Sequence, residues 1–182
     1  MRKAFGLLFA TSLLIPIGML SMAPAGAVAG TTCSAFKATI TNTPGLAKVG
    51  VTAKANVTVK LVGALTGCVG GGVTKAAITQ TYKYNGNCTT FITGKGGTTT
   101  PAVPVATFKW SNGKTSTATS TTKLLTKPGA TPAKLTLSTK ITAGLFVGAK
   151  STGTVTLAAP TGSCVSIPGS KATLTGGKAV FK

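Results

Sequence analysis

The sequence predicts an all-β, antiparallel fold stabilised by disulfides, and three observations lead to this prediction. Several short segments alternate apolar and polar residues with a period of two, which is typical of strands with one buried face. Thr, Val and Ile, whose branched side chains favour strands, supply much of these segments. Turn-forming residues separate the segments at short intervals, with no helical pattern between them. We therefore expect an antiparallel β-sandwich of the immunoglobulin-like kind, or a small Greek-key barrel, with two disulfides.

The strands can be followed along the chain from these alternating segments. They cover residues 36–41, 57–61, 82–84, 108–110 and 135–141. The Asn-Gly pairs that begin at Asn85 and Asn112 each lie between strand-like runs, and such pairs favour type I′ hairpin turns. The Thr- and Ser-rich segment 115–122 follows the second pair directly, so we expect a strand with a polar face there.

The aromatic residues of these segments are expected in the core. Phe108 and Trp110 lie two positions apart and therefore share one face of their strand, as do Tyr82 and Tyr84 on theirs. The alternative for Trp110 is an exposed ring that stacks on carbohydrate.

The first residues have the layout of a secretory signal. Arg2 and Lys3 precede an apolar run over 4–22, and small residues follow up to Ala29, where we expect cleavage. The alternative is an uncleaved anchor, since about 20 apolar residues are enough to cross a bilayer. We interpret 1–29 as the signal peptide and 30–182 as one secreted domain, with no integral membrane segment after cleavage.

All four cysteines lie in the predicted secreted part, and an even number in an oxidising compartment indicates two disulfides. Three pairings exist. The segments around Cys33 and Cys68 resemble two arms of a hairpin, which would place these cysteines opposite each other and leave Cys88 to pair with Cys164. Each bridge would then stabilise the fold by about 4 kcal/mol. A zinc site is the alternative, but the chain has no C-x-x-C pair.

The composition excludes most enzymatic chemistry. The chain contains no Asp, no Glu and no His. It therefore has no Ser-His-Asp triad, no carboxylate pair for glycoside cleavage and no carboxylate cage for a metal. A lysine of lowered pKa acting as the base for a serine is the remaining route, and of the S-x-x-K spacings in the chain none stands out. We expect a protein that is not an enzyme and that has no catalytic residue, cofactor or metal.

The positive charge favours anionic partners. Of 19 basic residues, Arg2 and Lys3 belong to the predicted signal, so 17 lysines remain with no acidic side chain. Such a chain should attract anionic cell-surface polymers such as wall glycopolymers, acidic polysaccharide or anionic lipid. Specific nucleic-acid recognition is not expected, because no arginine remains for base contacts. The alternative is that the lysines only keep the outer face soluble. The alternation turns five lysines outward as candidate contacts: Lys37, Lys60, Lys83, Lys109 and Lys140.

Several short motifs also resemble a group of small secreted all-β proteins of unassigned function from actinobacteria. The motifs are, in order, Gly67-Cys68-Val69-Gly70, Asn87-Cys88, the run 107–117, the run 142–148, Gly162-Ser163-Cys164 and Lys178-Ala179-Val180-Phe181. The resemblance covers most of the secreted part and implies a disulfide-linked sandwich and export. It implies no catalytic or binding residues.

Together these observations predict an exported, non-enzymatic protein of the cell envelope or the extracellular space with a structural or interaction role. The alternative is a lysine-rich module that binds anionic polymers. Either way, we expect the protein to be secreted or associated with the cell surface.

Overall fold

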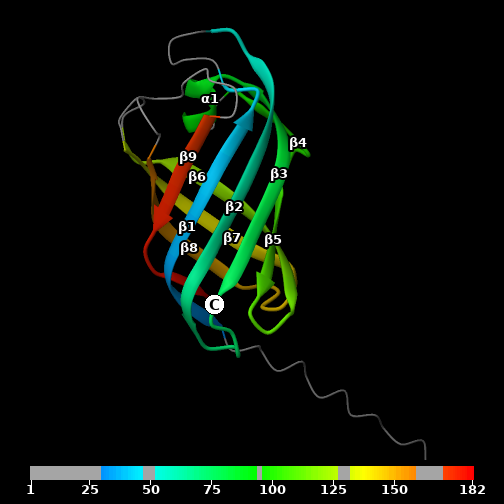
Figure 1. Cartoon of the computed structure of the whole chain (residues 1–182), viewed down its shortest axis with the longest axis vertical. Coiled ribbons are helices and arrows are strands. Elements are labelled where there is room, and N and C mark those ends of the chain that lie inside the picture. Colours follow the sequence, from blue (N-terminus) through cyan, green and yellow to red (C-terminus); the bar gives the residue numbers. More distant parts are fainter. Residues whose placement is uncertain (1–29, 47–51, 94–95, 127–131, 159–169) are drawn as a thin grey trace, which may run out of the picture.

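The computed structural model describes residues 30–46, 52–93, 96–126, 132–158 and 170–182 and consists almost entirely of antiparallel strands (Figure 1). In chain order the elements are β1 Thr31–Thr43, β2 Ala55–Val69, β3 Ala76–Gly86, α1 Cys88–Thr93, β4 Thr98–Thr100, β5 Val105–Trp110, β6 Thr115–Leu124, β7 Ala133–Gly144, β8 Lys150–Ala158, β9 Ser170–Gly176 and β10 Ala179–Phe181. The predicted signal peptide, 1–29, lies outside the described residues. Within the part of the chain that is described, no helix has the length and hydropathy needed to span a membrane.

Eight strands close into one barrel. Each strand pairs with the next along the chain in the order β1-β2-β3-β5-β6-β7-β8-β9, and β9 returns to pair with β1. The closing pair is antiparallel, with Phe36 opposite Gly176 and Asn42 opposite Ser170. The short strand β4 pairs with β3 outside this circuit. The all-β, antiparallel prediction is thus confirmed.

The predicted sandwich is wrong, and so is the Greek-key order. A sandwich has two sheets with free edges, whereas here β1 is paired on both sides, with β2 and with β9. Closure removes the sheet edges that a sandwich would leave unpaired. The barrel is a simple meander, because the circuit follows the order of the strands along the chain, leaving out only β4, until β9 pairs with β1.

One end of the barrel is filled by aromatic side chains. The rings of Phe108 and Trp110 are stacked, and Phe146 and Phe181 both meet Trp110 edge-on at centroid distances of 5.0 and 6.0 Å. Trp110 is 2% exposed, and its indole Nε1 donates a hydrogen bond to Ser116 Oγ at 2.8 Å. The prediction that Phe108 and Trp110 belong to the core is confirmed. β10 brings Phe181 into this cluster by pairing with the start of β1.

The helix α1 lies at the other end of the barrel (Figure 1). Asn87 caps it: the Asn87 side-chain oxygen accepts a hydrogen bond from the Thr90 amide, and Thr90 Oγ1 accepts one from the Asn87 amide. The hairpin turn predicted at Asn85 and Gly86 is wrong. Both residues end β3, opposite Asn56 and Ala55 of β2, and the chain continues into the capped helix.

The remaining local predictions hold in full or in part where the structure describes them. The Asn112-Gly113 pair connects β5 to β6, and the polar segment 115–122 is part of β6. The turn is not the predicted type I′, because Gly113 has a positive φ and Asn112 does not. Cys33 and Cys68 are opposite each other in the β1–β2 pair and form a disulfide. This is the one bridge in the described residues, since Cys164 of the second predicted pair lies outside them.

Candidate functional site

The interior of the barrel contains side chains that face inward without being fully packed. Leu61, Leu137 and Leu157 alternate with outward-facing neighbours, so they point to the inside, and yet each is only half-buried. Protein cores are normally filled to a density that leaves few voids. The surface that these leucines expose lines a cavity.

The cavity has a volume of about 370 Å³ and extends from the middle of the barrel toward the end that carries α1. Such a volume falls in the range of small-molecule binding sites, about 300 to 1,000 Å³. Eight-stranded barrels are either filled by their own side chains or hold one small ligand. The lining comprises Phe36, Ile40, Leu61, Ile78, Gln80, Tyr82, Tyr84, Thr90, Phe91, Gly97, Thr99, Pro104, Ala106, Phe108, Ser120, Thr122, Leu135, Leu137, Thr139, Val155, Leu157 and Leu174.

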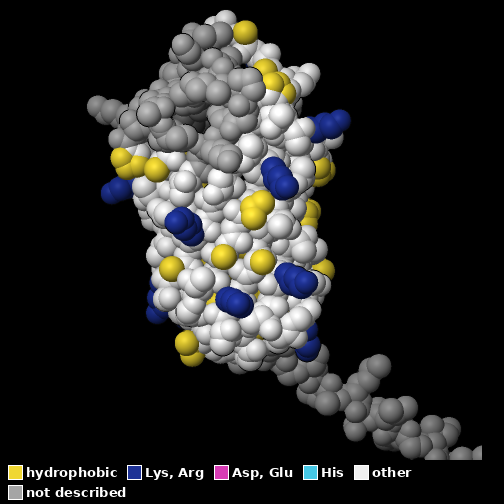
Figure 2. Space-filling view, viewed as in Figure 1, with side chains coloured by type: hydrophobic (Ala, Val, Ile, Leu, Met, Phe, Trp, Pro, Cys, Tyr) yellow, Lys and Arg dark blue, Asp and Glu magenta, His cyan; other side chains and the backbone are white. Residues whose placement is uncertain are grey.

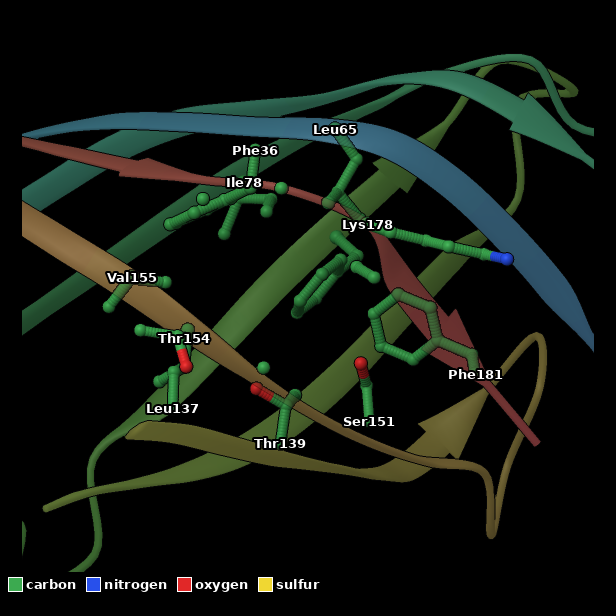
Figure 3. A pocket seen from close by; sticks show the side chains of 15 residues that line it. Phe36, Leu65, Ile78, Leu137, Thr139, Ser151, Thr154, Val155, Lys178 and Phe181 are labelled. Carbon is green, nitrogen blue, oxygen red and sulfur yellow. The ribbon is translucent and has the colours of Figure 1, made fainter. Parts of the chain in front are cut away.

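A second, smaller cavity of about 60 Å³ continues the interior toward the aromatic end (Figure 3). Thr139 and Ser151 present their hydroxyl groups to it, among aliphatic and aromatic neighbours. Lys178 contributes to the lining from the connection between β9 and β10, but its amino group points away from the other side chains and the residue is exposed. Phe36 and Phe108 line both cavities, so the two lie next to each other in the barrel interior.

The α1 end of the large cavity is ordered by contacts among its own lining residues. The Tyr84 hydroxyl donates a hydrogen bond to Thr90 Oγ1 at 2.7 Å, and the ring of Phe91 meets that of Tyr84 edge-on at 5.2 Å. A side chain at Gly97 would collide with Tyr84, since an added Cβ would lie 2.1 Å from the hydroxyl oxygen. Gly97 therefore allows the tyrosine to lie close to the backbone at this end.

The polar groups that the described residues bring to the cavity are few and uncharged. Ser120 and Thr139 hydrogen-bond to each other at 3.0 Å. Gln80 and Tyr82 face inward from β3 and are half-buried, and among the described residues neither side chain has a hydrogen-bond partner. Burial, with a smaller contribution from Tyr84, raises the pKa of Tyr82 to about 12. Burial also raises the pKa of Tyr84, against the opposing effect of its hydrogen bond to Thr90. Both phenols are therefore neutral at ordinary pH.

The described residues that line this cavity supply binding contacts. None of them is a lysine, an arginine or a cysteine, and the chain has no Asp, Glu or His, so these residues offer no proton donor or acceptor of suitable pKa and no ordinary metal ligand. Elsewhere in the described residues, no three His, Cys, Asp or Glu side chains lie together. What the lining supplies is apolar surface, two unpartnered neutral polar groups and shape.

The five predicted lysine contacts lie outside the barrel. Each is exposed, as the alternation predicts, and each belongs to a different strand. No two of them are opposite each other in the strand pairing, and on the face shown in Figure 2 the lysines stand apart with uncharged surface between them. The residues are Lys37 on β1, Lys60 on β2, Lys83 on β3, Lys109 on β5 and Lys140 on β7. Their role in binding anionic polymers stays a prediction.

The sequence-based prediction missed a row of three neighbouring lysines, Lys140, Lys150 and Lys182. Lys140 of β7 is directly opposite Lys150 of β8, and both side chains are exposed. Lys150 also exchanges two backbone hydrogen bonds with Lys182, at 2.8 and 3.2 Å, so the three lysines occupy adjacent positions across neighbouring chain segments. Like charges directly opposite in a sheet destabilise it by about 0.2 to 1 kcal/mol. Only the strand register, which local patterns do not give, brings these residues together.

The sequence-based prediction also did not identify Gln80 and Tyr82 as polar residues of a cavity, although the sequence carries a signal for Gln80. In β3 the inward face contains Ile78, Gln80, Tyr82 and Tyr84, so a glutamine occupies a position where alternation predicts an apolar residue. The expectation that Tyr82 and Tyr84 share a face is confirmed. Tyr84 is buried as expected of a core residue, whereas Tyr82 faces the cavity.

Comparison of the chain with known proteins adds no assignment to this geometry. No family model, no curated protein and no solved structure matches it. The resemblance to small secreted actinobacterial proteins therefore stays a prediction.

Proposed function

We propose that this protein is an exported, non-enzymatic binding protein whose barrel holds one small, largely apolar and uncharged molecule. The observation that carries the proposal is the set of inward-facing, half-buried leucines Leu61, Leu137 and Leu157 around a cavity of about 370 Å³. Apolar surface that is hidden from the outside but not packed by the protein can be covered by a ligand.

The uncharged character of the described lining residues defines the ligand class further. An ion among these residues would lose its hydration without meeting a side chain of opposite charge. An uncharged molecule would lose little hydration free energy. Burial of its apolar surface would favour binding by about 25 cal/mol per Å². A neutral ligand is therefore favoured over a fatty acid anion or a phosphate ester.

Titration of the purified protein with N-phenyl-1-naphthylamine tests this proposal, because this uncharged dye fluoresces strongly in apolar surroundings. We expect saturable fluorescence enhancement at a stoichiometry of one dye per chain. Leu137→Trp should abolish it by filling the interior, since Leu137 lines both cavities. Thr136→Trp, on the outward face of the same strand, is the matched control and should bind as the wild type does.

Two results would contradict the proposal. One is a wild-type protein that gives no saturable enhancement. The other is equal binding by Leu137→Trp and Thr136→Trp, which would place the dye outside the barrel. A cooperative unfolding transition in both variants shows that they are folded.

A second candidate function is binding of phosphate- or sulfate-bearing polymers at the outer surface. The observation that favours it is the row formed by Lys140, Lys150 and Lys182, where repulsion is not relieved by any acidic side chain of this chain. An anionic group bridging the row would convert the repulsion into attraction, and binding would weaken steeply with salt through counterion release. This function is compatible with ligand binding inside the barrel, since the two surfaces are separate.

Heparin chromatography tests the second candidate. Lys140→Gln with Lys150→Gln should elute at lower salt than Lys37→Gln with Lys83→Gln, which removes the same charge from lysines that have no lysine opposite them. Equal elution of the two variants, or failure of the wild type to bind at low salt, would contradict a local site at the row.

A further inference from the structure

The polar residues on the inner face of β3 stand out because no described residue pairs with their side chains. Gln80 is flanked across the sheet by Leu61 of β2 and Ala106 of β5, and Tyr82 lies opposite Val59. Neither side chain finds a hydrogen-bond partner among the residues that the structure describes. Both residues line the cavity, and neither contributes to the described side-chain polar atoms that are fully buried without a partner. Their hydrogen-bonding groups are therefore available to a molecule in the cavity.

Their placement relative to each other suits one ligand. The two residues are separated by one position on the same strand, so their Cα atoms lie about 7 Å apart on the same face. The amide of Gln80 can donate and accept a hydrogen bond, and the phenol of Tyr82 can do the same. Around them the lining is aliphatic and aromatic, including Ile78 and Phe108 toward the closed end of the barrel.

We propose that Gln80 and Tyr82 are the polar recognition element of the cavity, and that the ligand carries a neutral hydrogen-bonding group such as a hydroxyl, carbonyl or amide. This inference rests on the proposed function, since it specifies the ligand of the same cavity. The polar group of the ligand lies at Gln80 and Tyr82, and its apolar body points toward Ile78 and Phe108. Such an arrangement gives the ligand one orientation and discriminates against a pure hydrocarbon of the same shape.

Neutrality follows from the same residues. Burial favours the protonated form of Tyr82, and Gln80 does not titrate, so neither can compensate a charge on the ligand. Lys178, which lines the smaller cavity, directs its amino group outward (Figure 3). The cavity should thus prefer an alcohol or a ketone to the corresponding carboxylate.

The test compares three probes that share one apolar body: naphthalene, 2-naphthol and 2-naphthoate, measured by displacement of N-phenyl-1-naphthylamine at pH 7. In the wild type we expect 2-naphthol to bind more tightly than 2-naphthoate and at least as tightly as naphthalene. Gln80→Met and Tyr82→Phe keep the approximate volume of each side chain but remove its hydrogen-bonding group. Each substitution should weaken the binding of 2-naphthol about three- to tenfold, and the binding of naphthalene should stay unchanged or become tighter. Thr81→Val, on the outward face of the same strand, is the control and should change neither probe.

A stability measurement separates recognition from a structural role. If these groups act only on a ligand, the unliganded variants should be at least as stable as the wild type, because neither substitution breaks a hydrogen bond to a described residue. Loss of stability together with equal loss of all probes would assign Gln80 and Tyr82 to folding and overturn the inference.

The outcomes for the two proposals can be told apart. If no probe binds the wild type, the proposed function itself fails, and this inference fails with it. If naphthalene binds but 2-naphthol keeps its relative affinity in both variants, the cavity is a binding site and only the recognition role is overturned. Tighter binding of 2-naphthoate than of 2-naphthol by the wild type would also overturn it, without need of a variant.

Discussion

Replacing Ser116 with alanine should destabilise the protein by about 2 to 4 kcal/mol, because one hydroxyl serves two partners at the closed end of the barrel. Ser116 Oγ accepts the hydrogen bond from Trp110 Nε1 and donates one to the Leu145 carbonyl. Trp110 and Ser116 are 2% and 1% exposed, so water cannot replace the lost bond to the indole. An unpaired buried donor costs about 1 to 3 kcal/mol, and the less buried carbonyl adds about 1 kcal/mol.

Urea unfolding followed by tryptophan fluorescence measures this loss, and the chain contains a single tryptophan. Ser34→Ala is the matched control, because Ser34 is exposed and makes only a 3.2 Å hydrogen bond to the Thr66 carbonyl. Its effect should stay below about 0.5 kcal/mol. Equal, small effects of Ser116→Ala and Ser34→Ala would refute the reasoning, since the buried network would then contribute nothing beyond an exposed one.

Three further predictions concern the disulfide and the response to pH. The Cys33–Cys68 bridge spans a sequence separation of 35, so replacing both cysteines with alanine should lower the free energy of unfolding by about 4 kcal/mol; a loss below about 1 kcal/mol in urea unfolding would contradict the chain-entropy reasoning. Without side-chain carboxyl or imidazole groups, thermal stability at fixed ionic strength should change little between about pH 2 and pH 8, and a melting temperature that falls by many degrees on acidification would disagree. At high pH the change in the free energy of unfolding is set by Tyr82, whose folded pKa of about 12 lies above the ordinary value of 10.0. The stability that depends on the protonated phenol is therefore complete below about pH 10 and is lost as the pH rises through about 12. The wild type should therefore lose stability relative to Tyr82→Phe in this window, and a constant difference between the two in urea unfolding at about pH 9 and about pH 12 would count against it.

The strands themselves were predictable because they depend on local patterns. Alternation identified parts of five of the eight barrel strands, β1, β2, β3, β5 and β7, and the Asn112-Gly113 pair located the β5–β6 turn. The hairpin geometry also placed Cys33 opposite Cys68. At Asn85 the same kind of turn signal failed, because the capping interaction between Asn87 and Thr90 favours a helical turn immediately after β3. A capping pattern at these two residues was the signal for α1.

Closure of the barrel was not predictable in this way. A strand with one buried face has the same alternation in a sandwich as in a barrel. The difference lies in the pairing of β1 with β9, whose residues 36–42 and 170–176 lie near opposite ends of the described chain. No local pattern reports such a contact, and the outward lysines fit either architecture.

The cavity depends on a further property that sequence patterns do not report, the fit of side chains across the barrel. Leu61, Leu137 and Leu157 have the ordinary character of core residues, and only the three-dimensional arrangement leaves them half-buried. Gln80 is different. It precedes the predicted strand 82–84, and once that strand is extended to the observed start of β3, a polar residue on its buried face is an exception that requires a partner.

Occupation of the barrel interior can be measured most directly by NMR of protein labelled at its Leu, Ile and Val methyl groups during titration with N-phenyl-1-naphthylamine. We predict chemical-shift changes and contacts to the dye at the methyl groups of Leu61, Leu137 and Leu157, which line the cavity. Val62 and Val103, which are 48% and 58% exposed, should remain unchanged. Changes confined to these exposed valines, or no saturable change at any methyl group, would contradict the claim that the barrel is a binding site.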